Sequence, residues 1–264
     1  MMRSEWRREH LLPDHEHLAR EVWGQSWSLH DAEISEADAN WLASACERLD
    51  SGEPLAYILG YTPFYGCDIA VCPDVLIPRP ATEQMVDRIC SQFKDQSLKV
   101  LDLCTGSGCI AIALKKARPD WQVSAVDVSE AALAVAAQNA ERNQVSISWQ
   151  LWDITTEPPP SLACEWDVIV SNPPYVSWHE YLPEPSLRYE PLLALVPEGE
   201  RATVLYDVIA RFAAQFLSQK GELWVEHGHT QREEVIHIHK IFGLCHKACY
   251  ADYQGHDRIV VCTC

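Results

Sequence analysis

The spacing of apolar residues changes near residue 99 and divides this chain into two kinds of sequence. From there onward, short apolar runs alternate with longer segments in which apolar residues recur every three or four positions. Such alternation predicts strands and helices in turn, and therefore a mostly parallel sheet with helices on both faces. The predicted strands are 99–103, 122–126, 147–151, 168–170 and 221–225, and the predicted helices are 110–117, 129–143, 202–216 and 231–241.

Two further short strands are predicted near the end of the chain. Residues 249–253 and 258–262 flank a turn at Gly255, which predicts an antiparallel hairpin. The predicted fold class is therefore α/β, with a Rossmann-like sheet that is mostly parallel and has a C-terminal antiparallel hairpin.

The first sixty residues predict a small helical module instead. One helix is predicted over 14–23. A second is predicted to open at Ser35, which forms a capping pair with Asp38, and to close at Gly52. The apolar positions that recur at helical spacing in this second helix are Trp41, Leu42, Ala45 and Leu49.

The connection between the two modules has its own pattern. Aromatic and β-branched residues around Gly66 predict a short hairpin, and Pro73, Pro78 and Pro80 mark a linker. We therefore predict a helical domain at 1–60, a hairpin linker at 61–75 and an α/β domain at 76–264.

Composition narrows the classes of partner. The chain carries 21 Lys and Arg against 38 Asp and Glu, a net charge of −17, and shows no basic stripe, so we expect no direct nucleic-acid binding. It has no apolar run that could span a bilayer and its start is charged, so we expect a cytoplasmic protein without membrane association. Its 11 cysteines lack the paired spacing of a zinc site, so we expect reduced thiols and no metal.

A glycine turn joins the first predicted strand of the α/β domain to the helix that follows. Gly106 and Gly108 allow a ligand to approach the backbone closely, at the sheet edge where parallel sheets bind ligands. Asp127 lies nineteen residues further on, at the tip of the next strand, where its carboxylate can accept both hydroxyls of a ribose. The pattern predicts a site for a cofactor that contains a nucleoside.

Two classes of cofactor fit this turn. Residues 106–111 also match the dinucleotide fingerprint Gly-x-Gly-x-x-Gly/Ala, so an NAD-dependent enzyme is an alternative, and a plain helix-capping turn is another. Asp102 favours S-adenosylmethionine, because a carboxylate there would repel a pyrophosphate but can help to hold a cationic ammonium group.

The segment Asn172-Pro173-Pro174-Tyr175 comes just after the strand predicted at 168–170. The two prolines fix the backbone and leave carbonyl groups free to face a cleft. With the side-chain carbonyl of Asn172, these acceptors can hold a planar –NH2 group and favour its attack on a methyl donor, while Tyr175 can stack on its plane. The alternative is a rigid turn, but the position of the segment one strand–helix unit after Asp127 favours the functional interpretation.

Several stretches, in chain order, resemble one enzyme family. They are 52–60 (Gly-Glu-Pro-Leu-Ala-Tyr-Ile-Leu-Gly), 75–80 with Thr82 and Glu83, 101–108, 172–175, 188–191 with Ala194 and Leu195, and 226–228 with Gln231. Because they cover most of the chain, it is identified as a member of the protein-glutamine N-methyltransferases that modify peptide chain release factors.

The resemblance implies a class I methyltransferase sheet, S-adenosylmethionine as cofactor, and the glutamine of the Gly-Gly-Gln motif of class I release factors as target. It also implies that the helical N-terminal domain helps to recognise the release factor. The residues expected at the cofactor site are Asp102, Cys104, Thr105, Gly106, Ser107, Gly108, Asp127, Asp153, Ile154 and Asn172. The residues expected to hold the glutamine are Asn172, Pro173, Pro174 and Tyr175. Glu226 and His227 are expected to serve mainly in packing and loop hydrogen bonds.

Departures from the family pattern keep other substrates open. Ala81 stands where the family usually has an aspartate, Cys104 replaces a common glycine, and the N-terminal module is shorter than usual. Methylation of a glutamine in a large-subunit ribosomal protein is therefore an alternative, and DNA adenine methylation, which would need base flipping, is a more distant one. A catalytically silent binding protein with this fold is disfavoured by the intact Asp127 and Asn172.

Overall fold

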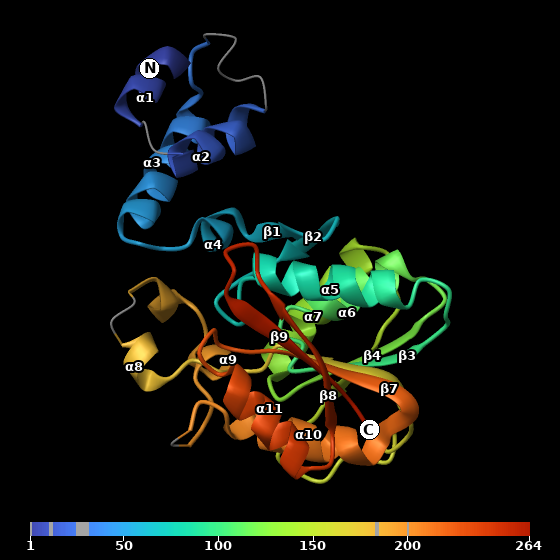
Figure 1. Cartoon of the computed structure of the whole chain (residues 1–264). Coiled ribbons are helices and arrows are strands. Elements are labelled where there is room, and N and C mark those ends of the chain that lie inside the picture. Colours follow the sequence, from blue (N-terminus) through green and yellow to red (C-terminus); the bar gives the residue numbers. More distant parts are fainter. Residues whose placement is uncertain (1, 11–12, 25–31, 183–184, 200) are drawn as a thin grey trace. The chain divides into compact units, whose positions relative to one another are not determined.

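The computed structural model describes residues 2–10, 13–24, 32–182, 185–199 and 201–264 (Figure 1). The chain forms two compact units, Met1–Gly60 and Tyr61–Cys264. The hairpin predicted as a linker belongs to the second unit.

The first unit is a small helical module with its own core. Its helices are α1 (Arg3–Glu9), α2 (Pro13–Trp23), α3 (Glu36–Asp50) and α4 (Leu55–Leu59). Ser35 caps α3 as predicted, since its hydroxyl accepts a hydrogen bond from the Asp38 backbone N–H at 3.1 Å. Leu42 and Ala45 are buried in this core, but Trp41 is 39% exposed. The prediction that Trp41 shares their face is therefore wrong, because it lies just outside the buried stripe of the helix.

The second unit is built on a seven-stranded sheet with the strand order β5-β4-β3-β6-β7-β9-β8. Its strands are β3 (Lys99–Leu103), β4 (Gln122–Asp127), β5 (Ser148–Leu151), β6 (Trp166–Ser171), β7 (Leu217–Glu226), β8 (Cys245–Ala251) and β9 (Asp257–Thr263). The pairs from β5 to β7 are parallel, and β9 is antiparallel to both β7 and β8. The predicted fold class, including the C-terminal antiparallel hairpin, is confirmed.

Helices cover both faces of this sheet (Figure 1). Helices α5 (Pro80–Gln92), α6 (Cys109–Ala117) and α7 (Glu130–Arg142) lie on one face, and α10 (Val204–Phe216) and α11 (Arg232–Ile241) on the other. The second face buries a continuous apolar core, in which Leu101, Ile169 and Leu223 of the sheet meet Ile209 and Val235 of the helices. Short helices follow β6: α8 (Trp178–Tyr181), η2 (Pro185–Tyr189) and α9 (Leu192–Leu195).

Helix α5 replaces part of the linker that the prolines predicted. Pro80 is the first residue of the helix, where its missing N–H costs nothing and its fixed φ suits the helical turn. Met85, Val86 and Ile89 are buried along one face. Their helical spacing is the signal that the concentration of prolines concealed.

The order of the strands in the sheet indicates where a ligand would bind. From β3 the chain moves outward through β4 to β5, then returns to form β6 on the other side of β3. The crevice outside the carboxyl ends of the strands at such a reversal is where open α/β sheets bind ligands. The glycine turn after β3 and the Asn172–Tyr175 segment after β6 both lie there.

The hairpin of β1 (Tyr61–Phe64) and β2 (Cys67–Ala70) is fastened to α7 by two asparagines one turn apart. Asn143 accepts from the N–H of Asp68 and donates to its carbonyl oxygen. Asn139 accepts from the N–H of Ala70 at 2.7 Å, and its amide donates to the carbonyl oxygens of Ala70 and Ser107, each at 3.0 Å. One side chain thus joins β2 to the glycine turn.

Replacement of Asn139 by alanine is therefore expected to destabilise the protein. Asn139 is fully buried, and its loss leaves one backbone N–H and two carbonyl groups without their partner, at a cost of about 3 kcal/mol in the free energy of unfolding. Urea-induced unfolding measures this change. The matched control is Gln138→Ala on the exposed side of α7, which should cost less than about 0.5 kcal/mol. A cost for Asn139→Ala as small as that of the control would contradict the anchoring role.

Candidate active site

A cavity of about 370 Å3 opens at the carboxyl ends of the parallel strands. Four segments that directly follow strands contribute to its wall: Cys104–Ser107 after β3, Asp127–Ser129 after β4, Trp152–Thr155 after β5, and Asn172 with Pro174 after β6. The rest of the wall comes from residues of 73–82, before and at the start of α5, from the first turns of α6 and α7, and from residues between 191 and 208 that are apolar except for Glu198. The sheet edge therefore brings together most of the predicted site residues.

The glycine turn is held in place by Asp127. The backbone N–H of Gly106 donates to Asp127 Oδ2 at 2.8 Å, and the N–H of Ser129 donates to Oδ1 at 3.0 Å. Each carboxylate oxygen can accept more than one hydrogen bond, so both remain able to accept a hydroxyl from the cavity. Gly106 has φ +55° and no atom within 4 Å of the position of a Cβ, so the backbone at this point is open to a ligand. The donor and acceptor pattern fits a ribose.

Gly108 has a different role from Gly106. A Cβ at Gly108 would lie 2.9 Å from the Trp149 ring and 3.0 Å from the Ala136 Cβ. Its φ of +80° also places it in the left-handed region that starts α6. Gly108 does not belong to the cavity wall among the described residues, so the glycine serves packing between the turn, β5 and α7.

Asp102 lies beneath the turn and not at the cavity wall. It is fully buried, and its Oδ2 accepts a hydrogen bond from the Thr105 hydroxyl at 2.6 Å. Burial raises the pKa of Asp102 to about 7, so the folded protein keeps a proton on this carboxyl at pH values where an exposed aspartate has lost it. Its observed contact supports the turn through Thr105.

This buried carboxyl predicts a pH-dependent stability. Because the pKa of Asp102 is about 7 in the folded protein against 3.8 in the unfolded chain, the folded state holds more protons between these values, and stability falls as pH rises through this window. The free energy of unfolding of Asp102→Asn, relative to that of the wild type, should therefore increase by roughly 4 kcal/mol from pH 3.8 to pH 8. Urea unfolding of both proteins across that range measures it. A constant difference between them would contradict the raised pKa.

The residues after β5 form a further part of the cavity wall. Asp153 Oδ1 accepts hydrogen bonds from the N–H of Thr155 at 2.9 Å and from its hydroxyl at 2.7 Å, which fixes the turn. Ile154 is buried, yet both Asp153 and Ile154 belong to the cavity wall. The carboxylate and the apolar side chain thus border one end of the space beside Asp127.

The segment after β6 approaches the cavity from the other side. Ser171 anchors it, since its hydroxyl donates to the Leu103 carbonyl oxygen at 2.7 Å. Asn172 and Pro174 line the cavity, whereas Pro173 is buried behind them. The Asn172 amide group donates from Nδ2 to Thr82 Oγ1 at 3.2 Å. Its carbonyl oxygen, on the other arm of the amide, remains available as an acceptor.

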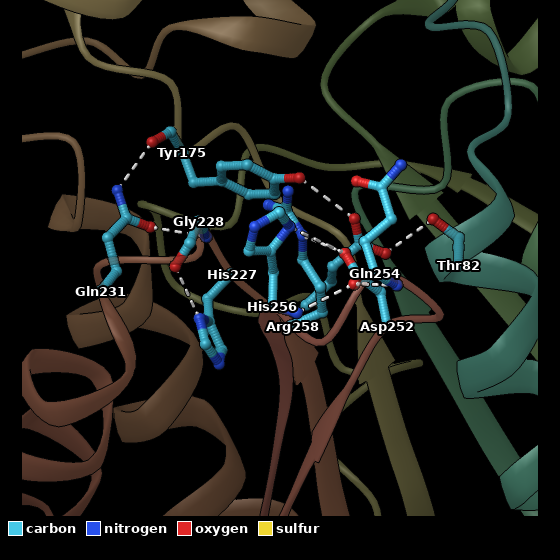
Figure 2. Close-up of polar contacts among 10 residues, drawn as sticks. Thr82, Tyr175, His227, Gly228, Gln231, Asp252, Gln254, His256 and Arg258 are labelled. Carbon is cyan, nitrogen blue, oxygen red and sulfur yellow. Dashed lines mark hydrogen bonds and ion pairs between the residues drawn. The ribbon is translucent and has the colours of Figure 1, made fainter.

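Tyr175 is not among the described residues that line the cavity, and hydrogen bonds hold it in place elsewhere. Its hydroxyl donates to Glu226 Oε1 at 3.0 Å, and its carbonyl oxygen accepts from the Gln231 amide at 2.8 Å (Figure 2). Gln231 also accepts from the N–H of Gly228 at 2.9 Å, so it ties the segment to the end of β7 (Figure 2). Stacking of Tyr175 on the substrate stays a prediction.

Glu226 and Thr82 are the site residues to which sequence reasoning gave no direct role. Glu226 is 1% exposed, and its two oxygens accept from Thr82 and Tyr175. Burial raises the pKa of Glu226, while these hydrogen bonds and the nearby Arg258 and Arg79 oppose that effect. Both residues lie in stretches that carry the family resemblance, at 75–83 and 226–228. The hydrogen bond between them could be found only from the folded structure.

A second pair of distant residues shapes the cavity. The buried Glu190 forms a salt bridge with Arg79 and accepts from the N–H of Ile77 at 3.0 Å. This pair holds the segment before α5 against the segment after β6, and both contribute to the wall. Its residues are 111 apart in the sequence, so periodicity could not have revealed it.

The comparisons with known proteins can now be set beside this site. A family model described as Methyltransferase small domain matches residues 80–183. The release factor glutamine methyltransferase of Lactococcus lactis is 38% identical over 239 residues, which cover 89% of this chain and 87% of that protein. That of Bordetella pertussis is 39% identical over 249 residues, which cover 92% and 91%. This chain belongs to the release factor glutamine methyltransferase family.

Solved structures agree on the fold of this family member. A methyltransferase from Pyrococcus furiosus superposes with a TM-score of 0.56 at 15% identity, and the match covers 84% of this chain and 98% of that one. The predicted family is confirmed, and the protein is a methyltransferase. The NAD-dependent alternative is therefore dropped.

In the described part of the chain, no group of three or more His, Cys, Asp or Glu side chains is arranged to hold a metal ion. None of the helices in the described ranges combines the length and apolar character needed to cross a bilayer.

Proposed function

We propose that this protein transfers a methyl group from S-adenosylmethionine to the side-chain amide nitrogen of the glutamine in the Gly-Gly-Gln motif of class I peptide chain release factors. The observation that carries the proposal is the position of Asn172. Its carbonyl oxygen is left to accept from a substrate amide at the cavity, across from the carboxylate of Asp127, in a chain of the release factor glutamine methyltransferase family. We expect the reaction in the cytoplasm, during the maturation of the translation termination machinery.

The cofactor side of the cavity suits S-adenosylmethionine. Asp127 would accept the ribose hydroxyls, and the backbone of 104–107 would run along the cofactor, with Asp153 and Ile154 beside the adenine. When bound, S-adenosylmethionine supplies an electrophilic methyl group on a sulfonium. The basic side chain in the described wall is Arg79, and it is paired with Glu190, which agrees with a cofactor that carries no phosphate.

The residues after β6 would position the glutamine amide. The Asn172 carbonyl oxygen and a main-chain carbonyl of 172–174 would accept the two hydrogens of the glutamine amide, which turns the nitrogen toward the cofactor side. Because the lone pair of an amide nitrogen is delocalised, acceptors on its hydrogens favour pyramidalisation and increase its nucleophilicity. Pro173 and Pro174 fix these acceptors in advance. When the nitrogen takes the methyl group from the sulfonium, it would lose one proton to solvent water.

We also propose that the helical unit at 1–60 contributes to recognition of the release factor. A net charge of −17 suits a partner with basic surfaces, since opposite charge accelerates encounter. Most of the glutamine-bearing protein must lie outside a cavity of about 370 Å3, so further surface of the enzyme has to provide affinity.

Mass spectrometry of a release factor incubated with the protein and S-adenosylmethionine tests the proposal. A gain of one methyl group on the peptide that contains Gly-Gly-Gln is expected, and a release factor with that glutamine changed to alanine is the control. No gain, with cofactor binding demonstrated in the same sample, would overturn the assigned substrate. The same assay with ribosomal proteins would then test the alternative.

A further inference from the structure

The side chain of Asn172 has two chemically opposite ends, and the reaction can use only one of them. Turned one way, its amide presents a carbonyl acceptor to the cavity, and turned the other way it presents an –NH2 donor that would repel the –NH2 group of a glutamine. Something other than Asn172 must therefore select the orientation. Its partner in the fold is the Thr82 hydroxyl, 3.2 Å from Nδ2.

We propose that Thr82 and Glu226 are positioning residues that set the orientation of the Asn172 amide, so that its carbonyl oxygen faces the substrate. This inference rests on the proposed function, because that function assigns the carbonyl oxygen to the glutamine. A threonine hydroxyl has one hydrogen, and here it is donated to Glu226 Oε2 at 2.6 Å. The hydroxyl can then only accept from Asn172, and this requires Nδ2 to face it.

The direction of this chain of hydrogen bonds is set by charge. An ionised Glu226 accepts at both oxygens, from Thr82 and from Tyr175. A protonated Glu226 can instead donate to Thr82, which then turns its own hydrogen toward Asn172 and stabilises the reversed amide. The same carboxylate accepts from the Tyr175 hydroxyl, so one buried group contacts Tyr175 directly and Asn172 through Thr82.

The surroundings of Glu226 suit this role. Thr82 and Glu226 are 2% and 1% exposed, so water does not compete for their hydrogen bonds. The groups that face Glu226 come from four elements: Thr82 of α5, Tyr175 after β6, Arg258 of β9 and Arg79 before α5, while the Tyr206 hydroxyl of α10 donates to its main-chain oxygen. Burial raises the pKa of Glu226, and the two hydrogen bonds and the two arginines oppose this rise and favour the ionised form, which the proposed orientation needs.

Kinetics of Thr82→Val and Thr82→Ser test the inference. Valine keeps the shape but removes the hydroxyl, and we expect kcat to fall about tenfold to a hundredfold, with KM for the release factor changed less than about threefold. Serine restores the hydroxyl and should restore kcat.

In wild type and Thr82→Ser, kcat should fall as Glu226 is protonated at acidic pH, and Thr82→Val should lose this dependence. The matched control is Thr203→Val, which removes a comparable 2.7 Å bond to Glu234 outside the cavity wall and should leave kcat unchanged.

A second measurement requires no substrate or cofactor. The chain has four asparagines, Asn40, Asn139, Asn143 and Asn172, so labelling with 15N-asparagine gives four assignable side-chain amide signals. We expect Thr82→Val to shift the Asn172 signal and to speed its exchange with water at least about tenfold, while Asn139 and Asn143 serve as internal references. Thr203→Val should move none of the four.

The outcomes separate the two proposals. An Asn172 signal that Thr82→Val leaves unchanged, or a variant with wild-type kcat and an intact acidic limb, would overturn the positioning role even if the release factor is methylated. The predicted change of the Asn172 signal, in a protein that methylates no release factor, would support the positioning role and overturn the proposed substrate.

Discussion

Asn172→Ala should lower kcat for release factor methylation by about a thousandfold, because it removes a preorganised acceptor that the reacting amide needs. The binding of S-adenosylmethionine should change less than about threefold, since the acceptors proposed for the cofactor, Asp127 and Asp153, belong to the ends of β4 and β5 and not to the segment after β6. Single-turnover methylation with a radiolabelled methyl group measures the rate, and calorimetry measures cofactor affinity on the same preparation.

A fall in rate without a fall in cofactor affinity would distinguish a role of Asn172 in the reaction from a role in supporting the cavity. Asn172 is tethered through Thr82 at 3.2 Å, so its truncation leaves Thr82 bound to Glu226 and the buried network in place. The thermal midpoint of unfolding should therefore stay close to that of the wild type. If rate and cofactor affinity fell together by the same factor, Asn172 would be supporting the cavity as a whole, and its assigned role would be wrong.

Local sequence signals account for the part of the fold that was predicted well. Strand β3, the glycine turn, α6 and β4 follow one another within thirty residues, and each is marked by its own periodicity or capping residue. Gly108 illustrates the limit of such signals. The pattern indicated a glycine beside the cofactor, but the physical requirement is the 2.9 Å approach of Trp149, a residue on another strand.

The parts that were missed depend on contacts between distant residues. Thr82 and Glu226 are 144 residues apart, and their hydrogen bond exists only because α5 packs against the end of β7. The wall from residues 191–208 likewise is not marked by one local pattern, since short turns and the start of α10 each supply a few side chains. Sequence patterns therefore placed the cofactor turn and the Asn172–Tyr175 segment, and the fold supplied the residues that orient them.

Asp127→Ala should weaken the binding of S-adenosylmethionine about a hundredfold, which corresponds to about 2.7 kcal/mol and to the loss of charge-assisted hydrogen bonds to the ribose. Part of the loss arises in the protein, because Asp127 also accepts from the N–H groups of Gly106 and Ser129.

Asp127→Asn separates the two contributions: its single carbonyl can still hold one of these N–H groups, but the carboxylate charge is absent. At saturating cofactor both variants should keep kcat within about threefold of the wild type, because the groups proposed to hold the glutamine follow β6 and not β4. Cofactor titrations of kcat and KM measure this, and a large fall in kcat with an unchanged affinity would move Asp127 from cofactor binding to the chemical step.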